Sequence, residues 1–187
     1  MQTYEAPIPV CASKADISAF AGQVAAKYNF ESGDFIQPLV ATLGGRIEYK
    51  PGACINGKLP ESIVIRSPND FTIFLPHMTS YHRNKLTTAD ELAHLFLHYP
   101  VVCRKTPNAI MVATRWVDEN DADQEQAELE ANWFAAAFLM HQEAFTRIFS
   151  QRGARHAAIM FGVNDRTVNL RARSLGLVPR ENLALQA

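Results

Sequence analysis

Residues 87–98 read Thr-Thr-Ala-Asp-Glu-Leu-Ala-His-Leu-Phe-Leu-His, and this stretch decides how the rest of the chain is interpreted. On an α-helix, residues four apart lie on the same face, so Asp90, His94 and His98 form one row with Glu91 beside them. The spacing is that of the H-E-x-x-H motif, with aspartate in the place of the first histidine. In that motif two imidazoles hold zinc, and the glutamate polarises the metal-bound water and moves its proton.

The same residues also have a purely structural explanation. Thr88 and Glu91 match a capping box, and acidic residues in a first helical turn are favoured by the helix dipole. His94 and His98 would then be hydrogen-bonded histidines of the core. These residues alone leave the metal site and the structural explanation equally open.

A second informative segment, residues 125–141, reads EQAELEANWFAAAFLMH and predicts a long helix. Its apolar stripe is flanked on opposite sides by Glu128 and Glu130, so periodicity does not decide which glutamate faces a site. A zinc site with only two helical ligands is incomplete and needs a third ligand, which a later helix often supplies.

The pattern along the rest of the chain predicts an α+β fold with a small antiparallel sheet, because helices are followed by short strands and then by helices again. Gly44 and Gly45 end an early helix, and Pro100 is expected to stop the helix of the motif. Residues 52–60 are rich in turn formers, and residues 101–123 are expected to be irregular. The predicted helices span residues 13–29, 35–43, 87–99, 124–141, 154–161 and 165–175, and the predicted strands span residues 46–50, 62–66 and 71–75.

Composition sets the class of protein. Of 187 residues, 48% are apolar and 20% are charged, which is typical of a globular domain and excludes a disordered chain. No apolar run approaches the roughly 20 residues of a membrane-spanning helix, and the N-terminus does not resemble a secretory signal. Cys11, Cys54 and Cys103 lack the spacing of a disulfide framework or a thiolate zinc site, so reduced, mostly buried thiols in a cytoplasmic protein are expected.

Charge is unevenly distributed, although the net charge is only -1. Seven arginines and one acid lie between Phe145 and Arg180, and seven acids without a base lie between Asp118 and Glu130. An acidic block of this kind is usually solvated, whereas a basic C-terminal third could contact nucleic acid. Neither block decides the function.

Three ordered segments together resemble the ImmA/IrrE family of metallopeptidases. Residues 83–98 (RNKLTTADELAHLFLH) resemble its active-site helix, roughly R-x-R-F-T-L-A-H-E-L-G-H-L-L-L-H. Residues 130–140 (EANWFAAAFLM) resemble its second signature, E-x-x-A-N-x-F-A-A-x-L-L-M-P, and residues 157–177 (AAIMFGVNDRTVNLRARSLGL) resemble its usual ending. The resemblance covers residues 14–178, and three ordered signatures are more specific than any one of them.

The resemblance implies a zincin-like peptidase domain over residues 1–145, followed by a helix-turn-helix-like extension over residues 146–187 that packs on it. It makes His94 a zinc ligand and Glu91 the general base. Glu128, which precedes x-x-Ala-Asn, becomes the third ligand, and Glu130 is no longer a candidate. The expected role of Asn132 is to brace a ligand histidine through a hydrogen bond. The family's trailing histidine corresponds to His98, which is expected to be structural.

Asp90 departs from the family pattern, because it stands where the first zinc-binding histidine is found. An aspartate side chain is shorter than a histidine side chain, although aspartate can ligate zinc. A ligand set of Asp90, His94 and Glu128 is more anionic than the usual one and suits manganese or iron better. We therefore expect weaker zinc binding and reduced or lost activity.

The C-terminal segment has a signal of its own. Residues 158–168 follow the rhythm of a helix-turn-helix, with Asn164 as the N-cap of the second helix. Arg166, Arg171 and Arg173 lie along that helix and could contact DNA. The alternative, which we favour, is that these helices complete the peptidase-like domain and that the arginines are solvated.

Two functions of different classes follow from these residues. The first is a metal-dependent endopeptidase that cleaves a helix-turn-helix repressor of the Xre type and so relieves repression of phage, mobile-element or stress genes. The second is a catalytically inactive pseudopeptidase that acts as a protein-binding regulator or as a toxin–antitoxin component. Asp90 favours the second function, whereas retention of Glu91, His94 and Glu128 favours the first. Contact with DNA is a weaker third option, and no membrane partner is expected.

Overall fold

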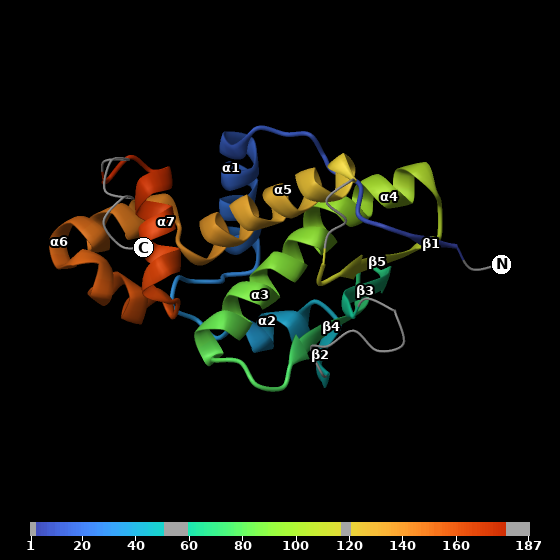
Figure 1. Cartoon of the computed structure of the whole chain (residues 1–187), viewed down its shortest axis with the longest axis horizontal. Coiled ribbons are helices and arrows are strands. Elements are labelled where there is room, and N and C mark those ends of the chain that lie inside the picture. The colour runs from blue at the N-terminus through green and yellow to red at the C-terminus, as the bar shows by residue number, and fades with distance from the viewer. Residues whose placement is uncertain (1–2, 51–59, 117–120, 179–187) are drawn as a thin grey trace.

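The structure is a computed structural model that describes residues 3–50, 60–116 and 121–178 (Figure 1). It has the α+β class that the sequence predicts. In chain order the elements are β1 (Tyr4–Glu5), α1 (Lys14–Lys27), α2 (Ile36–Thr42), β2 (Gly45–Lys50), β3 (Glu61–Ser67), β4 (Asp70–Pro76), α3 (Tyr81–Ala93), the π-helical turn η1 (His94–His98), α4 (Tyr99–Lys105), β5 (Ile110–Thr114), α5 (Ala122–Leu139), α6 (Gln142–Phe161) and α7 (Asp165–Ser174).

The strands form one five-stranded sheet in the order β1-β5-β3-β4-β2. The central strand β3 is antiparallel to β4 and to β5, whereas β2 pairs with β4 and β1 pairs with β5 in parallel. The sheet is therefore mixed: the predicted small antiparallel sheet is found in the two pairings of β3, whereas the pairings of β2 and β1 are parallel. Among the described residues, a tight turn at residues 67–70 joins β3 to β4, and its sequence Ser-Pro-Asn-Asp is typical of a turn.

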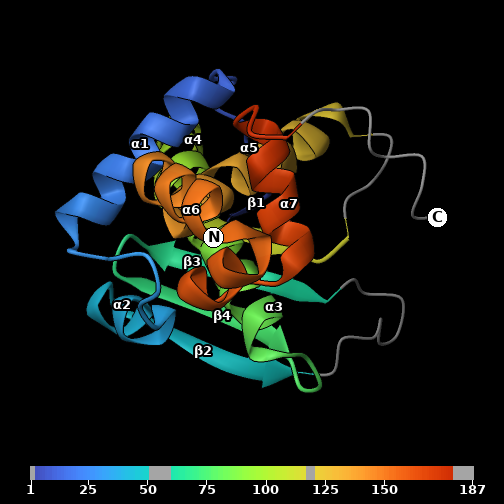
Figure 2. The ribbon, with the colours of Figure 1, turned by 90° about the vertical axis from the view of Figure 1, so that its left-hand side faces the viewer.

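Helices cover the sheet in successive layers (Figures 1 and 2). Helix α3 packs against β4 and α5, and α1 packs against the other side of α5. The core between these elements is apolar and closely packed. It includes the stacked rings of Phe30, Phe134 and Phe138: the ring centroids of Phe30 and Phe138 are 4.6 Å apart, and those of Phe134 and Phe138 are 5.6 Å apart. This packing fixes α3 and α5 side by side, which places their polar residues against each other.

The helix of the motif is longer than predicted and does not stop at Pro100. Helix α3, η1 and α4 follow one another without a break, from Tyr81 to Lys105. At the junction, the Tyr99 N–H donates to the carbonyl of His94, five residues earlier. Proline has no N–H and clashes with the preceding turn of a regular helix, whereas the wider π turn before Pro100 removes that conflict. The turn of the helix that contains both histidines is therefore the irregular one.

The start of α3 also excludes the capping-box explanation of Thr88. The N-cap is Ser80, whose hydroxyl accepts a hydrogen bond from the Arg83 N–H. Thr88 is buried in the middle of the helix, and its hydroxyl donates to the carbonyl of Asn84 at 2.8 Å. Glu91 is consequently not a capping residue of a first turn.

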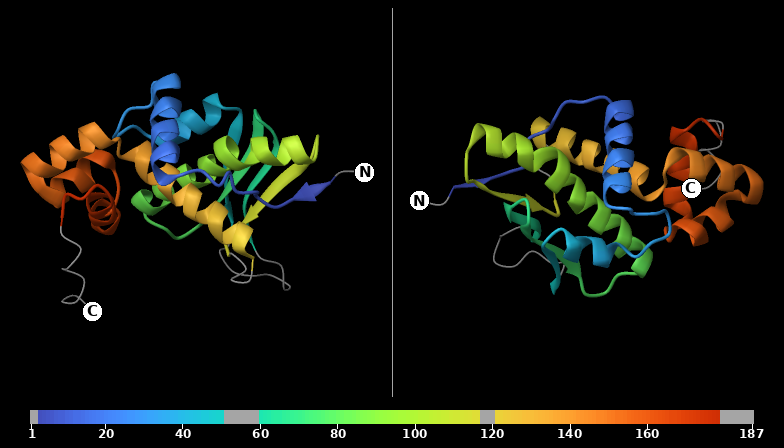
Figure 3. Two further views of the ribbon diagram at one scale, coloured as in Figure 1. Left: turned by 90° about the horizontal axis from the view of Figure 1, so that it is seen from above. Right: turned by 180° about the vertical axis from the view of Figure 1, so that it is seen from behind.

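At one end of the molecule, α6 and α7 form a helical pair that lies beside the end of α5 (Figure 3). Gly153 kinks α6 with φ 77°, and Gly162 ends it in the left-handed conformation with φ 63°. Asn164 is the N-cap of α7, as predicted, and accepts a hydrogen bond from the Thr167 N–H at 2.8 Å. The expected domain limit between residues 145 and 146 lies within the first turn of α6.

Three further expectations concern membrane-spanning helices, the cysteines and the turn-rich segment. None of the helices in the described ranges has the length and apolar character needed to cross a membrane. Cys11 is exposed and Cys103 is half-buried, so the prediction of mostly buried thiols was wrong for Cys11. Cys54 and nearly all of the turn-rich segment 52–60 lie outside the described residues.

Candidate functional site

The π-helical turn η1, which continues α3, and helix α5 bring two predicted site residues into direct contact. His94 Nε2 lies 3.1 Å from Glu128 Oε1. The imidazole is buried, at 1% exposed, whereas the Glu128 side chain is 29% exposed. The contact joins residues that are far apart in the sequence, and it supports the assignment of Glu128, rather than Glu130, as the glutamate that faces His94.

The second nitrogen of His94 contacts His98, and His98 contacts Glu130. His94 Nδ1 and His98 Nδ1 are 2.9 Å apart, and His98 Nε2 lies 3.1 Å from Glu130 Oε2. Burial, and then the charge of His94, lower the pKa of His98 to about 2, so this imidazole is neutral. A neutral imidazole has one N–H. We assign that N–H to Nε2, where it donates to the Glu130 carboxylate, and His98 Nδ1 then accepts from the N–H on His94 Nδ1.

This tautomer directs His94 Nε2 toward Glu128. Burial lowers the pKa of His94, but the hydrogen bond to Glu128 and the charges of Glu91, Glu128 and Asp90 outweigh burial and raise it. When it is protonated, the ring donates from Nε2 to Glu128 and from Nδ1 to His98. We expected a structural role for His98. In this structure, the hydrogen bond between His98 and His94 sets the orientation of the His94 ring.

Glu130, the glutamate that the resemblance set aside, forms part of the hydrogen-bond network around His94. It is 0% exposed and accepts hydrogen bonds from the N–H groups of Val10 and Cys11 at 2.9 Å and 2.8 Å, and from Gln126 Nε2 at 3.0 Å. With the bond from His98, these donors fully satisfy its carboxylate. The donors that identify Glu130 lie in the N-terminal segment, about 120 positions away. The pattern of residues along the helix therefore does not reveal them.

On the other side of His94, two carboxylates each have one oxygen without a partner. Asp90 Oδ1 and Glu91 Oε2 are buried and have no hydrogen-bond partner. Burial raises the pKa of Glu91 to about 7, and the charge of Glu128 adds to that effect. Burial also raises the pKa of Asp90 well above its usual value, with Glu91 and Glu128 contributing. Unsatisfied buried acceptors are rare in folded proteins, so they indicate a place where a further group binds.

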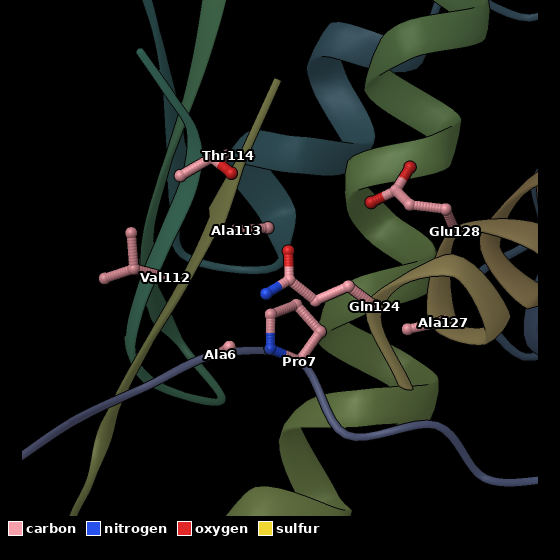
Figure 4. Close-up of a pocket in the computed structure, with 8 residues that line it drawn as sticks. All are labelled: Ala6, Pro7, Val112, Ala113, Thr114, Gln124, Ala127 and Glu128. Atoms are coloured by element: carbon pink, nitrogen blue, oxygen red, sulfur yellow. The ribbon is translucent and has the colours of Figure 1, made fainter. Parts of the chain in front are cut away.

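These carboxylates line a cavity of about 660 Å³ between α3 and the ends of three strands. Its volume is within the usual range of ligand-binding sites, about 300–1,000 Å³. A second, smaller cavity of about 110 Å³ lies beside Glu128, and Figure 4 shows Gln124 and Glu128 projecting from α5 above Pro7, on the side facing β5. The larger cavity is lined by Ser62, Pro76, Met78, Thr79, Ser80, Arg83, Asn84, Thr87, Asp90, Glu91, Thr114, Arg115, Trp116 and Glu128.

Comparison with protein families agrees with this geometry. The model of the peptidase family described as the IrrE N-terminal-like domain matches residues 66–172, which is more than half of the chain. The chain belongs to the ImmA/IrrE family. The match includes all of α3, η1 and α5, and so every residue of the site except those contributed by β3 and by the N-terminal segment.

The fold is also shared with a solved structure, a Mycobacterium tuberculosis transcriptional regulator, with a TM-score of 0.56 and 15% sequence identity. The similarity covers 89% of this chain and 48% of that one, so the chain spans about half the length of the regulator it matches. A search of curated protein sequences gives no match. These comparisons establish the zincin-like fold and a metallopeptidase-like domain.

Members of the ImmA/IrrE family typically depend on zinc, but the donor atoms in the described part of this chain do not form a ligand set for that metal. Within residues 3–50, 60–116 and 121–178, no group of three or more histidine, cysteine, aspartate or glutamate side chains is arranged to hold a metal ion. His94 and Glu128 hydrogen-bond directly to each other, and Asp90 does not complete a ligand set with them.

Asn132 and Arg171 make other contacts in the structure than the ones predicted for them. Asn132 is exposed and donates to the carbonyl of Glu128 at 2.8 Å on its own helix, so the expected contact with a histidine is made by His98 instead. Arg171 is only 4% exposed and donates from Nε to the carbonyl of Met140 at 3.2 Å. It therefore joins α7 to the end of α5 and is not accessible as a DNA contact, whereas Arg166 is exposed and Arg173 is half-buried.

Proposed function

We propose that this chain is a regulatory pseudopeptidase, which binds a segment of a partner protein in the cavity beside α3 and has lost metal-dependent hydrolysis. The observation that carries the proposal is the pair of buried, unpartnered carboxylate oxygens of Asp90 and Glu91, which face a cavity without forming a metal-ligand set. Such a site can bind donors of another molecule, but it lacks the ligands that position a catalytic metal.

The proposed partner is a transcription regulator of the helix-turn-helix type. Support comes from the family, whose members act on such regulators, and from the fold shared with a protein described as a transcriptional regulator. Protein-binding rather than DNA-binding is favoured because Arg171, in the middle of the basic helix, is buried in the fold. A role in a toxin–antitoxin pair is one form that such binding could take.

A metal-dependent endopeptidase is the second candidate function. It is favoured by the 3.1 Å spacing of His94 Nε2 and Glu128 Oε1 and by the presence of Glu91 at the position of the general base. In this alternative, Asp90, His94 and Glu128 would bind zinc, manganese or iron, and the metal would supply Lewis-acid chemistry. Its substrate would be a helix-turn-helix repressor.

Metal binding separates the two candidates. We would measure bound metal by mass spectrometry on protein purified without chelator, and zinc affinity by calorimetry, for the natural chain and for Asp90→His. We expect no stoichiometric metal in the natural chain and zinc binding tighter by orders of magnitude in Asp90→His. Asp90→Asn is the matched control, because it changes the charge without adding an imidazole.

One equivalent of metal in the natural chain would overturn the loss of hydrolysis and favour the endopeptidase. An unchanged zinc affinity in Asp90→His would show that residue 90 is not at the first ligand position. The partner itself is tested by two-hybrid screening against helix-turn-helix regulators from the same genome. We expect a complex in which the regulator stays intact during incubation, and cleavage by the natural chain would contradict the proposal.

A further inference from the structure

Two arginines line the site cavity. Arg83 is exposed in the first turn of α3, and Arg115 is half-buried directly after β5; both line the 660 Å³ cavity. Burial lowers the pKa of Arg115, Glu91 raises it, and the charge of Arg83 lowers it further. The two guanidinium groups are therefore close enough to repel each other, although they come from segments more than 30 residues apart in the sequence.

The fold positions Arg115 but leaves part of its guanidinium unsatisfied. Its Nη2 donates to the carbonyl of Phe74 at 2.7 Å, which fixes the side chain, whereas its Nε is buried without a partner. Neither Arg115 nor Arg83 takes part in an ion pair within the described ranges. Glu91 is the acidic side chain whose charge acts on Arg115, and it remains outside ion-pair distance.

We propose that Arg83 and Arg115 form a carboxylate-binding subsite, which binds an acidic side chain or the C-terminal carboxylate of the partner segment. The inference rests on the proposed function, because it assumes that a peptide segment occupies the cavity. Guanidinium groups are well suited to this task, since their fork of N–H donors matches the two oxygens of a carboxylate.

The rest of the cavity favours a singly charged group over a phosphate. Asp90, Glu91 and Glu128 line the same cavity, so a dianion bound by the arginines would be repelled more strongly than a carboxylate. The lining of the cavity therefore combines acidic and basic side chains. The partner segment is expected to place its acidic group at the arginines and its N–H or cationic donors toward Asp90 and Glu91.

Two exposed apolar side chains adjoin the arginines. Met78 is 96% exposed and Trp116 is 58% exposed, and both line the same cavity. Tryptophan, methionine and arginine are enriched at protein interfaces, and tryptophan and arginine dominate their binding hot spots. We therefore expect an apolar residue next to the acidic residue in the bound segment.

The test uses the full chain and two libraries of random heptapeptides, one displayed between fixed flanks and one with a free C-terminus. We expect the natural chain to enrich peptides with aspartate or glutamate at one fixed position, or a free C-terminal carboxylate, and the two libraries distinguish these sources. Affinities of the selected peptides are then measured by calorimetry. We expect them to fall about tenfold in Arg83→Gln and about ten- to a hundredfold in Arg115→Gln, as for loss of a hydrogen bond to a charged group.

Further variants separate a loss of binding from other effects of the substitutions. Arg115→Lys keeps the charge and should restore part of the affinity, and Arg147→Gln removes an exposed arginine on α6 as the matched control. Arg83 is exposed and its side chain makes no hydrogen bond to any described residue, so Arg83→Gln reports on binding even if an Arg115 variant folds poorly. Selected peptides without an acidic preference, or affinities unchanged in both variants, would overturn the subsite and leave the proposed function standing. Selection of no peptide at all would overturn both.

Discussion

The two sides of His94 differ in how completely their polar groups are paired. On one side, His98 and Glu130 form a closed network with the N-terminal segment, and every hydrogen-bonding atom of the Glu130 carboxylate has a partner. On the other side, Asp90 and Glu91 each leave one buried oxygen unpaired toward a cavity. The first network holds the histidine in place, and the second is available for another molecule.

The comparison shows that burial alone does not distinguish structural from functional charge. Glu130 and Glu91 are almost equally buried, at 0% and 4% exposed. The two carboxylates differ in whether all their oxygen atoms have hydrogen-bond partners. A fully paired buried group stabilises a fold, whereas an unpaired one destabilises it. Replacing each group in turn should therefore change stability in opposite directions.

The largest effect is expected from breaking the closed network with Glu130→Ala. The substitution leaves His98 and two main-chain N–H groups without their acceptor; each buried donor left unpaired costs about 1–3 kcal/mol, so we expect a total loss of about 3–5 kcal/mol. Unfolding in urea, followed by circular dichroism, measures this loss. Glu128→Ala is the control on the same helix. Its partly exposed side chain should cost less than about 1 kcal/mol, and equal losses in both variants would remove the distinction.

Lys85→Met extends the comparison to a buried cation. Lys85 is 0% exposed and its Nζ donates to the carbonyl of Phe161 at 3.0 Å, which joins α3 to the end of α6. Loss of the donor leaves a buried carbonyl unpaired and should cost about 1–3 kcal/mol at neutral pH.

The difference in stability between the natural chain and Lys85→Met should change with pH in one direction. Burial lowers the pKa of Lys85 below 10.5, so the unfolded chain binds more protons than the folded one as that range is approached. The stability of the natural chain relative to Lys85→Met should therefore rise with pH toward 10.5. Urea midpoints at several alkaline pH values test this, and a relative stability that falls with pH would contradict it.

Glu91→Gln should have the opposite sign from Glu130→Ala. The amide keeps the shape of the side chain and removes a buried carboxylate whose Oε2 has no partner, so we expect a gain of about 1 kcal/mol at neutral pH. Thermal unfolding by calorimetry gives the difference. A loss of stability as large as that of Glu130→Ala would mean that Glu91 belongs to the closed network.

The smallest effect is expected for Cys11→Ala. Cys11 contributes its main-chain N–H to Glu130, and alanine keeps that donor, so the change in the free energy of unfolding should stay within about 0.5 kcal/mol. Cys11→Pro is the informative contrast, because proline has no N–H and does not adopt the φ of 53° found at this position. Similar unfolding midpoints for the two variants would show that the bond from Cys11 contributes little.

The elements that the sequence predicted well are those whose signals are local. Residues 13–29 have a clear helical stripe and match α1, and turn residues mark the β3–β4 connection. By contrast, β5 was missed: Ile110–Thr114 is short, has no alternation of polar and apolar residues, and exists because it pairs with β3. A strand that depends on its partner in this way has little signal of its own.

The same limit explains the outcome for the site. The i, i+4 spacing located Asp90, His94 and His98 on one helix, and the family resemblance selected Glu128. Neither argument could identify Glu130, whose donors lie in the N-terminal segment. The subsite of Arg83 and Arg115 was equally invisible, because a loop after a missed strand brings the second arginine to the cavity.

The π turn between His94 and His98 has a consequence for comparing this chain with its relatives. A regular α-helix turns by about 100° per residue, and a π turn accommodates one more residue than a regular turn does. The phase of the helix therefore shifts by about one position across η1, and a single helical wheel drawn through residues 81–105 assigns wrong faces to α4. Relatives with an unbroken α-helix here should align with a one-residue gap. Deleting one residue from the turn would rotate α4 by about 100° relative to α3.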